Sequence, residues 1–400
     1  MQGYETIVST GIYWGVSSMN KVLDLFCGTG GFSKGFEDVD QGDFEVIFGI
    51  DLLPTSVETF KLNHQRAFGV SGDIRRYKKT EVAEKIKVSR GDVSVIIGGP
   101  PCQGFSSIRP FRSVNDDDPR NSLFEEFAAY VNFFRPKVFV FENVTGLATH
   151  KNGETIAVMQ ECFKNLGYEC DWRLLNAAHY GVPQKRERLI MIGTERGGKV
   201  NFPEPTHYFN GSTIGFKDKK KVVSSTNGAL FDDDKLLPAV TVMNAISDLP
   251  QIAAGESIGK YSYAPKNDYQ AQRRKDEKIL KLHSSTAHTE KMLEIISHAG
   301  KNIDCIPKHL ITSGFSSCYS RLDADEPAVT ITVNFVHPAS NRCIHPEQDR
   351  ALTPREGARL QSFDDDFKFS GSRTQIVKQI GNAVPPLLGK AIAEQVAAAL

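Results

Sequence analysis

The sequence predicts an α/β fold with a doubly wound, mostly parallel sheet and a second, smaller domain of irregular structure. Short apolar strands alternate with predicted helices as far as residue 195. Several of these strands end in glycine turns or polar residues, and ligands of open α/β sheets bind at such strand ends. Beyond residue 195, pieces rich in Gly, Ser, Lys and Asp replace the regular alternation. We therefore expect a first domain at 1–195 and a second at 196–372.

The first predicted strand, residues 21–26, runs directly into the glycine-rich turn Cys27–Ser33. Glycine lets the backbone turn tightly and approach a ligand closely. A second strand, residues 44–50, ends at Asp51, about twenty residues past the glycines, where a carboxylate can accept both hydroxyls of a ribose. A plain turn explains these features as well, but together they favour a nucleotide-type site. Ser33 replaces the third glycine of the dinucleotide fingerprint, which weakens a nicotinamide interpretation.

Two further strand ends carry reactive side chains. The buried strand at residues 93–97 is stopped by glycines and prolines, and Cys102 follows them. A buried structural cysteine in a Gly/Pro turn is an equally simple interpretation of that stretch alone. Residues 137–141 form another strand, which ends at Glu142. Both side chains are therefore expected at the carboxyl edge of one sheet.

Three polar side chains, Gln184, Arg186 and Arg188, alternate just before an apolar strand, so we expect them on one face.

Capping residues and apolar periodicity predict several helices. Thr353 is expected to cap a helix over residues 353–363, with Pro354 at its first position and Glu356 completing a capping box. The other predicted helices cover residues 54–63, 123–134 and 290–298 and an apolar C-terminal segment that ends at Leu400.

The net charge is zero, with 48 basic and 48 acidic side chains, and does not itself indicate a polyanionic partner. Two segments depart from this balance. Residues 184–221 hold nine Lys and Arg against four Asp and Glu, and residues 260–281 hold seven against three. Charge runs are often plain solvated faces, but these two are compatible with one basic face that contacts nucleic acid.

The sequence shows no sign of export or membrane insertion. No apolar run approaches the roughly 20 residues that a membrane helix needs, and residues 1–20 lack the features of a signal peptide. The seven cysteines are an odd number without a C-x-x-C pair, and His150, His179 and His207 show no ligand spacing. We therefore expect a cytoplasmic protein with reduced thiols, no metal site and no membrane span.

A thiol, a carboxylic acid and arginines beside a nucleotide-type site suit chemistry on cytosine. Carbon 5 of cytosine is a poor nucleophile until a thiolate adds to carbon 6, and a hydrogen bond or proton at N3 favours that addition. Arginine can hold the carbonyl oxygen at position 2. The candidates for these roles are Cys102, Glu142 and either Arg186 or Arg188.

The chain resembles the DNA (cytosine-5)-methyltransferases, above all the bacterial modification enzymes, from roughly Lys21 to Lys390. Any one matching block could arise by chance, but the ordered set is specific to this family. The blocks are Asp24–Phe32, Gly99–Ser106, Phe141–Val144, Gln184–Arg188, Arg321–Leu322 with Pro327 and Thr330, and Gln379–Val384.

The resemblance implies the class I S-adenosylmethionine-dependent methyltransferase fold and a role for each candidate residue. By it, Cys102 is the nucleophile, Glu142 the partner of N3, and Arg188 the contact to the base with Arg186 beside it. The positions that match the S-adenosylmethionine site are Phe26, Gly28, Gly30, Asp51, Asp73, Ile74, Asn382 and Val384.

The resemblance also implies a function for each domain. Residues 1–195 would bind S-adenosylmethionine and catalyse, residues 196–372 would recognise the DNA target, and residues 373–400 would return to the catalytic domain. A thiol cannot reach a base inside a duplex, so the cytosine must be flipped out of double-stranded DNA. We expect a monomer, because one chain carries every catalytic block. Bacterial members often have a cognate restriction endonuclease.

Four other classes of protein share parts of this pattern. A zinc deaminase needs P-C-x-x-C, but residue 105 is Phe. A nicotinamide oxidoreductase leaves Cys102 and the arginines without a role. A tRNA cytosine-5 methyltransferase has the same blocks, although the long variable segment favours DNA. A catalytically silent DNA-binding relative should have lost the nucleophile or the acid, and both are present.

Overall fold

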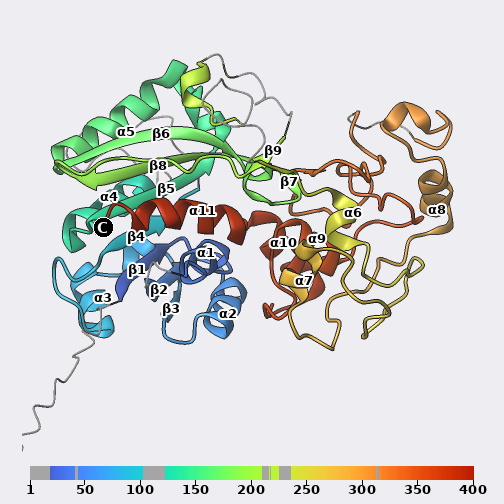
Figure 1. Ribbon diagram of the computed structural model, residues 1–400, viewed down its shortest axis with the longest axis horizontal. Helices are drawn as coiled ribbons and strands as arrows, with labels where there is room; N and C mark the ends of the chain where they lie inside the picture. Colours follow the sequence, from blue (N-terminus) through green and yellow to red (C-terminus); the bar gives the residue numbers. More distant parts are fainter. Residues whose placement is uncertain are drawn as a thin grey trace, which may run out of the picture.

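The computed structural model describes residues 19–40, 44–101, 122–209, 216, 218–224, 236–311, 314 and 316–400. In this part of the chain, the main sheet has seven strands in the order β3-β2-β1-β4-β5-β8-β6 (Figure 1). Neighbouring strands are parallel except β8, which is antiparallel to both β5 and β6. The predicted mostly parallel α/β sheet is confirmed. Its strands are β1 (Asn20–Leu25), β2 (Phe44–Asp51), β3 (Phe68–Ser71), β4 (Val95–Gly98), β5 (Val138–Val144), β6 (Tyr168–Asn176) and β8 (Glu187–Glu195).

Helices cover both faces of this sheet, because successive side chains of each buried strand point to opposite sides. Leu23 of β1 packs into the core beneath one set of helices, whereas its neighbour Val22 packs into the core on the other face. The first set is α3 (Lys79–Ile86), α4 (Ser122–Phe134) and α5 (Glu154–Asn165), and the second core includes α1 (Gly31–Glu37), α2 (Pro54–Asn63) and α11 (Pro386–Ala397).

The C-terminal helix α11 packs against α1, although the two are far apart in sequence (Figure 1). They approach so closely that a Cβ at Gly35 would lie 2.5 Å from the carbonyl carbon of Gly389. Glycine is therefore required at Gly35 for this contact. Residues from the end of the chain thus complete the core of the first part.

Beside the main sheet lies a smaller body with short helices and long irregular segments (Figure 1). Its larger buried cluster includes side chains from Val242 to Ala383. Its helices are α6 (Val242–Ile246), α7 (Asp268–Arg274), α8 (Glu290–Ser297), α9 (Pro354–Leu360) and α10 (Arg373–Asn382). A separate, smaller cluster of Ile295, Ile306 and Leu310 lies at α8. The remaining short elements are β7 (Gln184–Lys185), β9 (His207–Tyr208), β10 (Leu237–Pro238), β11 (Ala328–Val329) and the 3-10 turns Ile74–Arg76, Thr145–Ala148, His150–Gly153, Ala177–Tyr180, Lys219–Lys221 and Ile303–Cys305.

Helix α9 holds the smaller body together through buried ion pairs. Thr353 and Glu356 form the predicted capping box at its start, and the helix ends at Leu360, earlier than expected. The fully buried guanidinium of Arg359 binds the carboxylate of Asp365, with 2.6 Å between Arg359 Nε and Asp365 Oδ1. Arg359 also pairs with Asp248 near α6. These pairs fix the segments that carry Asp248 and Asp365 against α9.

Among the described residues, no helix combines the length and apolar character needed to cross a membrane. Over the same ranges, no three His, Cys, Asp or Glu side chains lie close enough together to hold a metal ion.

Candidate active site

The glycine turn after β1 is built by left-handed backbone and by a carboxylate from the next strand. Phe26, Gly28 and Gly30 have φ of 64°, 51° and 85°. The N–H of Gly28 donates to Asp51 Oδ2 at 3.0 Å, and the N–H of Leu53 donates to Asp51 Oδ1 at 2.9 Å. Burial raises the pKa of Asp51, although these hydrogen bonds oppose the shift. The carboxylate therefore fixes the turn from the end of β2.

The two glycines of this turn have different surroundings. A Cβ at Gly28 would meet no atom within 4 Å, whereas a Cβ at Gly30 would lie 2.3 Å from His64 Nε2. The turn is therefore open beside Gly28 and packed behind Gly30. Each oxygen of Asp51 retains capacity to accept a further hydrogen bond, because an ionised carboxylate offers about four lone-pair positions. An open backbone turn and an acceptor carboxylate fit the adenosyl group of S-adenosylmethionine.

Two further residues predicted to bind the cofactor lie in the segment after β3, and a backbone hydrogen bond connects that segment to Asp51. Asp73 and Ile74 follow β3, and the N–H of Gly72 donates to the carbonyl of Asp51 at 2.9 Å. Asp73 accepts from the Arg75 side chain, which lowers the pKa of Asp73, while Ile74 is buried.

The last two predicted cofactor residues come from the C-terminal part of the chain. Asn382 ends α10 and is exposed, whereas Val384 is half-buried. The carbonyl oxygen of Val384 lies so near α1 that a Cβ at Gly31 would be 2.4 Å from it. The chain after α10 therefore lies against the start of α1.

Glu142 and Arg188 form an ion pair across the antiparallel strands β5 and β8. Arg188 Nε lies 2.9 Å from Glu142 Oε1, and the two side chains are 14% and 13% exposed. A Cβ at Gly99 would be 2.7 Å from Glu142 Oε2, so glycine allows the carboxylate to lie against the end of β4. The side chain of Asn143 donates to the carbonyl of Pro100 at 2.9 Å. The segment that leads to Cys102 is thus held beside Glu142.

Cys102 itself lies outside the described residues, which stop at Pro101 before this gap. Asn143 belongs to the matching block Phe141–Val144, which predicted no role for this residue. Its position directly after Glu142 was the available signal, because a short polar side chain at a strand end commonly bonds nearby backbone.

Arg186 and Gln184 have different partners from Arg188. The three side chains were expected on one face before an apolar strand, but Arg186 lies between two strands, β7 and β8, and Arg188 is already within β8. The buried guanidinium of Arg186 donates to the carbonyls of Ile331 and Asn382 at 3.3 and 3.5 Å, and its Nε has no partner among the described residues. Burial and the neighbouring Arg188 lower the pKa of Arg186.

Gln184 binds the smaller body through both ends of its amide. The side chain donates to the carbonyl of Leu360 at 3.1 Å and accepts from the N–H of Ile331 at 2.8 Å. Gln184 and Arg186 therefore join the sheet to the smaller body, while Arg188 pairs with Glu142.

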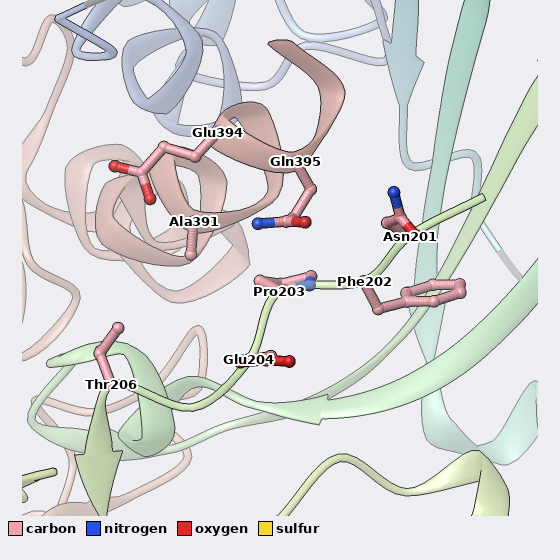
Figure 2. Close-up of a pocket in the computed structure, with 8 residues that line it drawn as sticks. All are labelled: Asn201, Phe202, Pro203, Glu204, Thr206, Ala391, Glu394 and Gln395. Atoms are coloured by element: carbon pink, nitrogen blue, oxygen red, sulfur yellow. The ribbon is translucent and has the colours of Figure 1, made fainter. Parts of the chain in front are cut away.

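A separate cavity of about 290 Å³ lies between α11 and residues 201–206 (Figure 2). Pro203 faces Ala391 across it, and Glu204 and Glu394 contribute carboxylates. It contains none of the residues predicted from the sequence.

The sheet order, with one antiparallel strand in a parallel sheet, and the glycine turn after the first strand define a class I methyltransferase fold. A protein encoded within an E. coli prophage has a similar structure, with a TM-score of 0.70 and 23% identity over 95% of this chain and 99% of that one. DNMT2 of Spodoptera frugiperda has a TM-score of 0.56 and 17% identity, over 94% and 99% of the two chains.

The family follows from sequence comparison. The profile of the C-5 cytosine-specific DNA methylases matches residues 20–398, and the chain belongs to this family of DNA (cytosine-5)-methyltransferases. The type II methyltransferase M.AgeI of Thalassovita gelatinovora is 32% identical over 95% of this chain and 100% of that protein. M1.HphI of Haemophilus parahaemolyticus is 36% identical over 94% and 86%. Membership implies S-adenosylmethionine as the methyl donor.

Proposed function

We propose that this protein methylates carbon 5 of a cytosine flipped out of one specific double-stranded DNA sequence, through a covalent adduct between Cys102 and carbon 6. The observation that carries the proposal is the Glu142–Arg188 pair beside the Pro100–Pro101 segment that leads to Cys102. The glycine turn lies one strand away, because β1 and β4 are neighbours.

In this mechanism the Cys102 thiolate forms a bond to carbon 6, and the electrons of the double bond move to carbon 5. Glu142 holds a proton at N3 and so favours the addition, while Arg188 fixes the Glu142 carboxyl and binds the base. S-adenosylmethionine supplies the methyl group that carbon 5 takes up. Loss of the proton from carbon 5 then expels the thiolate and restores the aromatic ring.

The residues proposed to hold S-adenosylmethionine lie around the open turn beside Gly28. Asp51 would accept from the ribose hydroxyls with the lone pairs that Gly28 and Leu53 leave free. The same site would be completed by Phe26, Gly30, Asp73, Ile74, Asn382 and Val384.

The proposed target-recognition domain is residues 196–372, which form most of the smaller body, and 1–195 is the proposed catalytic domain. Residues 373–400 would return to the catalytic domain, and this segment begins with α10, which packs in the smaller body. Flipping a base costs a few kcal/mol, and phosphate contacts from the basic segments 184–221 and 260–281 would offset that cost. Relatives named as type II methyltransferases favour a modification enzyme of a restriction-modification system, with a cognate endonuclease. The proposal also includes a cytoplasmic location and action as a monomer, because one chain carries every catalytic block.

The test is transfer of labelled methyl from S-adenosylmethionine to unmethylated duplex DNA, with tRNA as a parallel substrate and mapping at base resolution. Label on carbon 5 of cytosine within one short DNA sequence is the expected result. Label on tRNA alone would show that the substrate is tRNA and not DNA. No label on either, with DNA still bound, would indicate a catalytically silent relative.

A further inference from the structure

His64, at the C-terminal end of α2, touches both ends of helix α1. Its Nε2 lies 3.1 Å from the carbonyl oxygen of Gly30, and its Nδ1 lies 2.8 Å from Glu37 Oε2. Gly30 is the residue directly before α1, and Glu37 is the last residue of that helix. The His64 side chain is fully buried, whereas Glu37 is 29% exposed. One ring thus connects the glycine turn to the far end of the helix that follows it.

The contacts of the ring are chemically specific. A carbonyl oxygen accepts but cannot donate, so the Nε2 bond requires hydrogen on that nitrogen. An ionised Glu37 is also an acceptor, so both bonds form together when both ring nitrogens carry hydrogen. Phe60, one turn earlier on α2, packs on the ring with 4.7 Å between centroids. The ring is therefore held by packing as well as by its two bonds.

The backbone of the turn at Gly30 lies directly against the His64 side chain. Gly30 has φ of 85°, and a Cβ there would lie 2.3 Å from His64 Nε2. The carbonyl of Gly30 also accepts the N–H of Lys34 at 2.8 Å, the first hydrogen bond of α1. Since the N–H of Gly30 bonds the carbonyl of Cys27 at 2.8 Å, a shift of Gly30 would move the turn around Gly28.

We propose that His64 is a positioning residue that sets the conformation of the glycine turn, and hence the affinity for S-adenosylmethionine, through its bond to the Gly30 carbonyl. The inference rests on the proposed function, in which this turn holds S-adenosylmethionine. Neither the sequence blocks nor the cysteine chemistry assigns His64 a role.

Two substitutions separate the two bonds of the ring. In His64→Gln, the amide nitrogen can occupy the place of Nε2 and keep a donor toward Gly30. In His64→Asn, the shorter amide reaches only the place of Nδ1, so the bond to Glu37 is kept and the bond to Gly30 is lost. The matched control is Asn63→Ala, because Asn63 bonds the backbone of Thr59 and Lys368 instead of the turn.

The experiment measures the Kd of each protein for labelled S-adenosylmethionine by equilibrium dialysis, with KM and kcat for methyl transfer and thermal unfolding without ligand. His64→Asn should raise Kd and KM about tenfold with kcat nearly unchanged, the effect of one lost buried hydrogen bond, whereas His64→Gln should stay within about threefold. Asn63→Ala should bind like the wild type.

An equal loss of affinity for S-adenosylmethionine in His64→Asn and His64→Gln would overturn the inference. Wild-type affinity in His64→Asn would also overturn it. A loss of kcat with unchanged KM would also overturn it. Wild-type protein that binds no S-adenosylmethionine would overturn the proposed function itself, and the inference with it.

Discussion

Glu142 and Arg188 come from antiparallel neighbouring strands and form a 2.9 Å ion pair beside the chain segment that leads to Cys102. Both side chains are mostly withdrawn from solvent. The location of the pair against the end of β4 is compatible with the proposed role of Glu142 toward N3 of a cytosine.

Replacing Glu142 by Gln should abolish most methyl transfer without changing the affinity for S-adenosylmethionine. The amide keeps the shape of the side chain but cannot supply a carboxyl proton, and general acid catalysis typically contributes 10²–10⁴-fold. Single-turnover transfer to DNA and equilibrium dialysis with S-adenosylmethionine measure the two effects. Transfer within about threefold of the wild type would contradict the role of Glu142.

Arg188→Lys should also lose most activity, because a lysine is a point charge and cannot bind Glu142 and a base carbonyl in the fork geometry of a guanidinium. Arg173→Lys on the adjacent strand β6 is the matched control, since Arg173 pairs with Asp171 and is 26% exposed. Comparable losses of kcat/KM in both variants would show that the effect is not specific to the proposed site.

Asp24 should make stability depend on pH. It is buried beneath the glycine turn, accepts from Ser33 Oγ at 2.6 Å, and burial raises its pKa to about 7. Between pH 5 and 8 the unfolded chain has already released this proton, while the folded protein releases it only near pH 7. The free energy of unfolding therefore falls as pH rises, by about 2–3 kcal/mol from this group.

The measurement is urea denaturation of the wild type and Asp24→Asn at pH 5 and pH 8. Because the amide does not titrate, the variant should lose less stability than the wild type between these two pH values. Equal losses in both proteins would rule out Asp24 as the titrating group.

Asp365→Asn should destabilise the smaller body by about 3–5 kcal/mol, because it removes the carboxylate that the buried guanidiniums of Arg355 and Arg359 share. Arg359 would keep only Asp248 as an anionic partner. The neighbouring Asp366→Asn is the control. Asp366 pairs with Lys275 at 3.3 Å, and both side chains are more than 40% exposed, so its loss should cost less than about 1 kcal/mol. Chemical denaturation compares them, and equal effects would contradict the buried network.

Local signals in the sequence predicted several elements well. Proline at the first position fixed the start of α2 at Pro54, and Thr353 with Glu356 fixed the start of α9. The start of α10 was missed, although Ser372 and Gln375 form a capping box of the same kind. Such signals act within one turn of helix, so they need no knowledge of the rest of the fold.

What could not be predicted depends on contacts between distant segments. The residues of β8 do not indicate that this strand runs antiparallel to β5. The interruption between β7 and β8 lies at Arg186, whose side chain bonds the distant carbonyls of Ile331 and Asn382. The role of His64 could not be predicted, because its partners, Gly30 and Glu37, lie 34 and 27 residues away in the chain and only the tertiary fold brings them to it. The position of Cys102 lies outside the described residues.

The most direct test of the central claim is a covalent trap. In duplex DNA synthesised with 5-fluorocytosine, carbon 5 carries fluorine, which cannot leave as a cation, so the adduct at carbon 6 cannot be expelled after methyl transfer. We expect a denaturation-resistant protein–DNA complex that requires S-adenosylmethionine, with the modified peptide mapped to Cys102 and no complex from Cys102→Ser. A stable complex through another cysteine, or methyl transfer by Cys102→Ser, would contradict it.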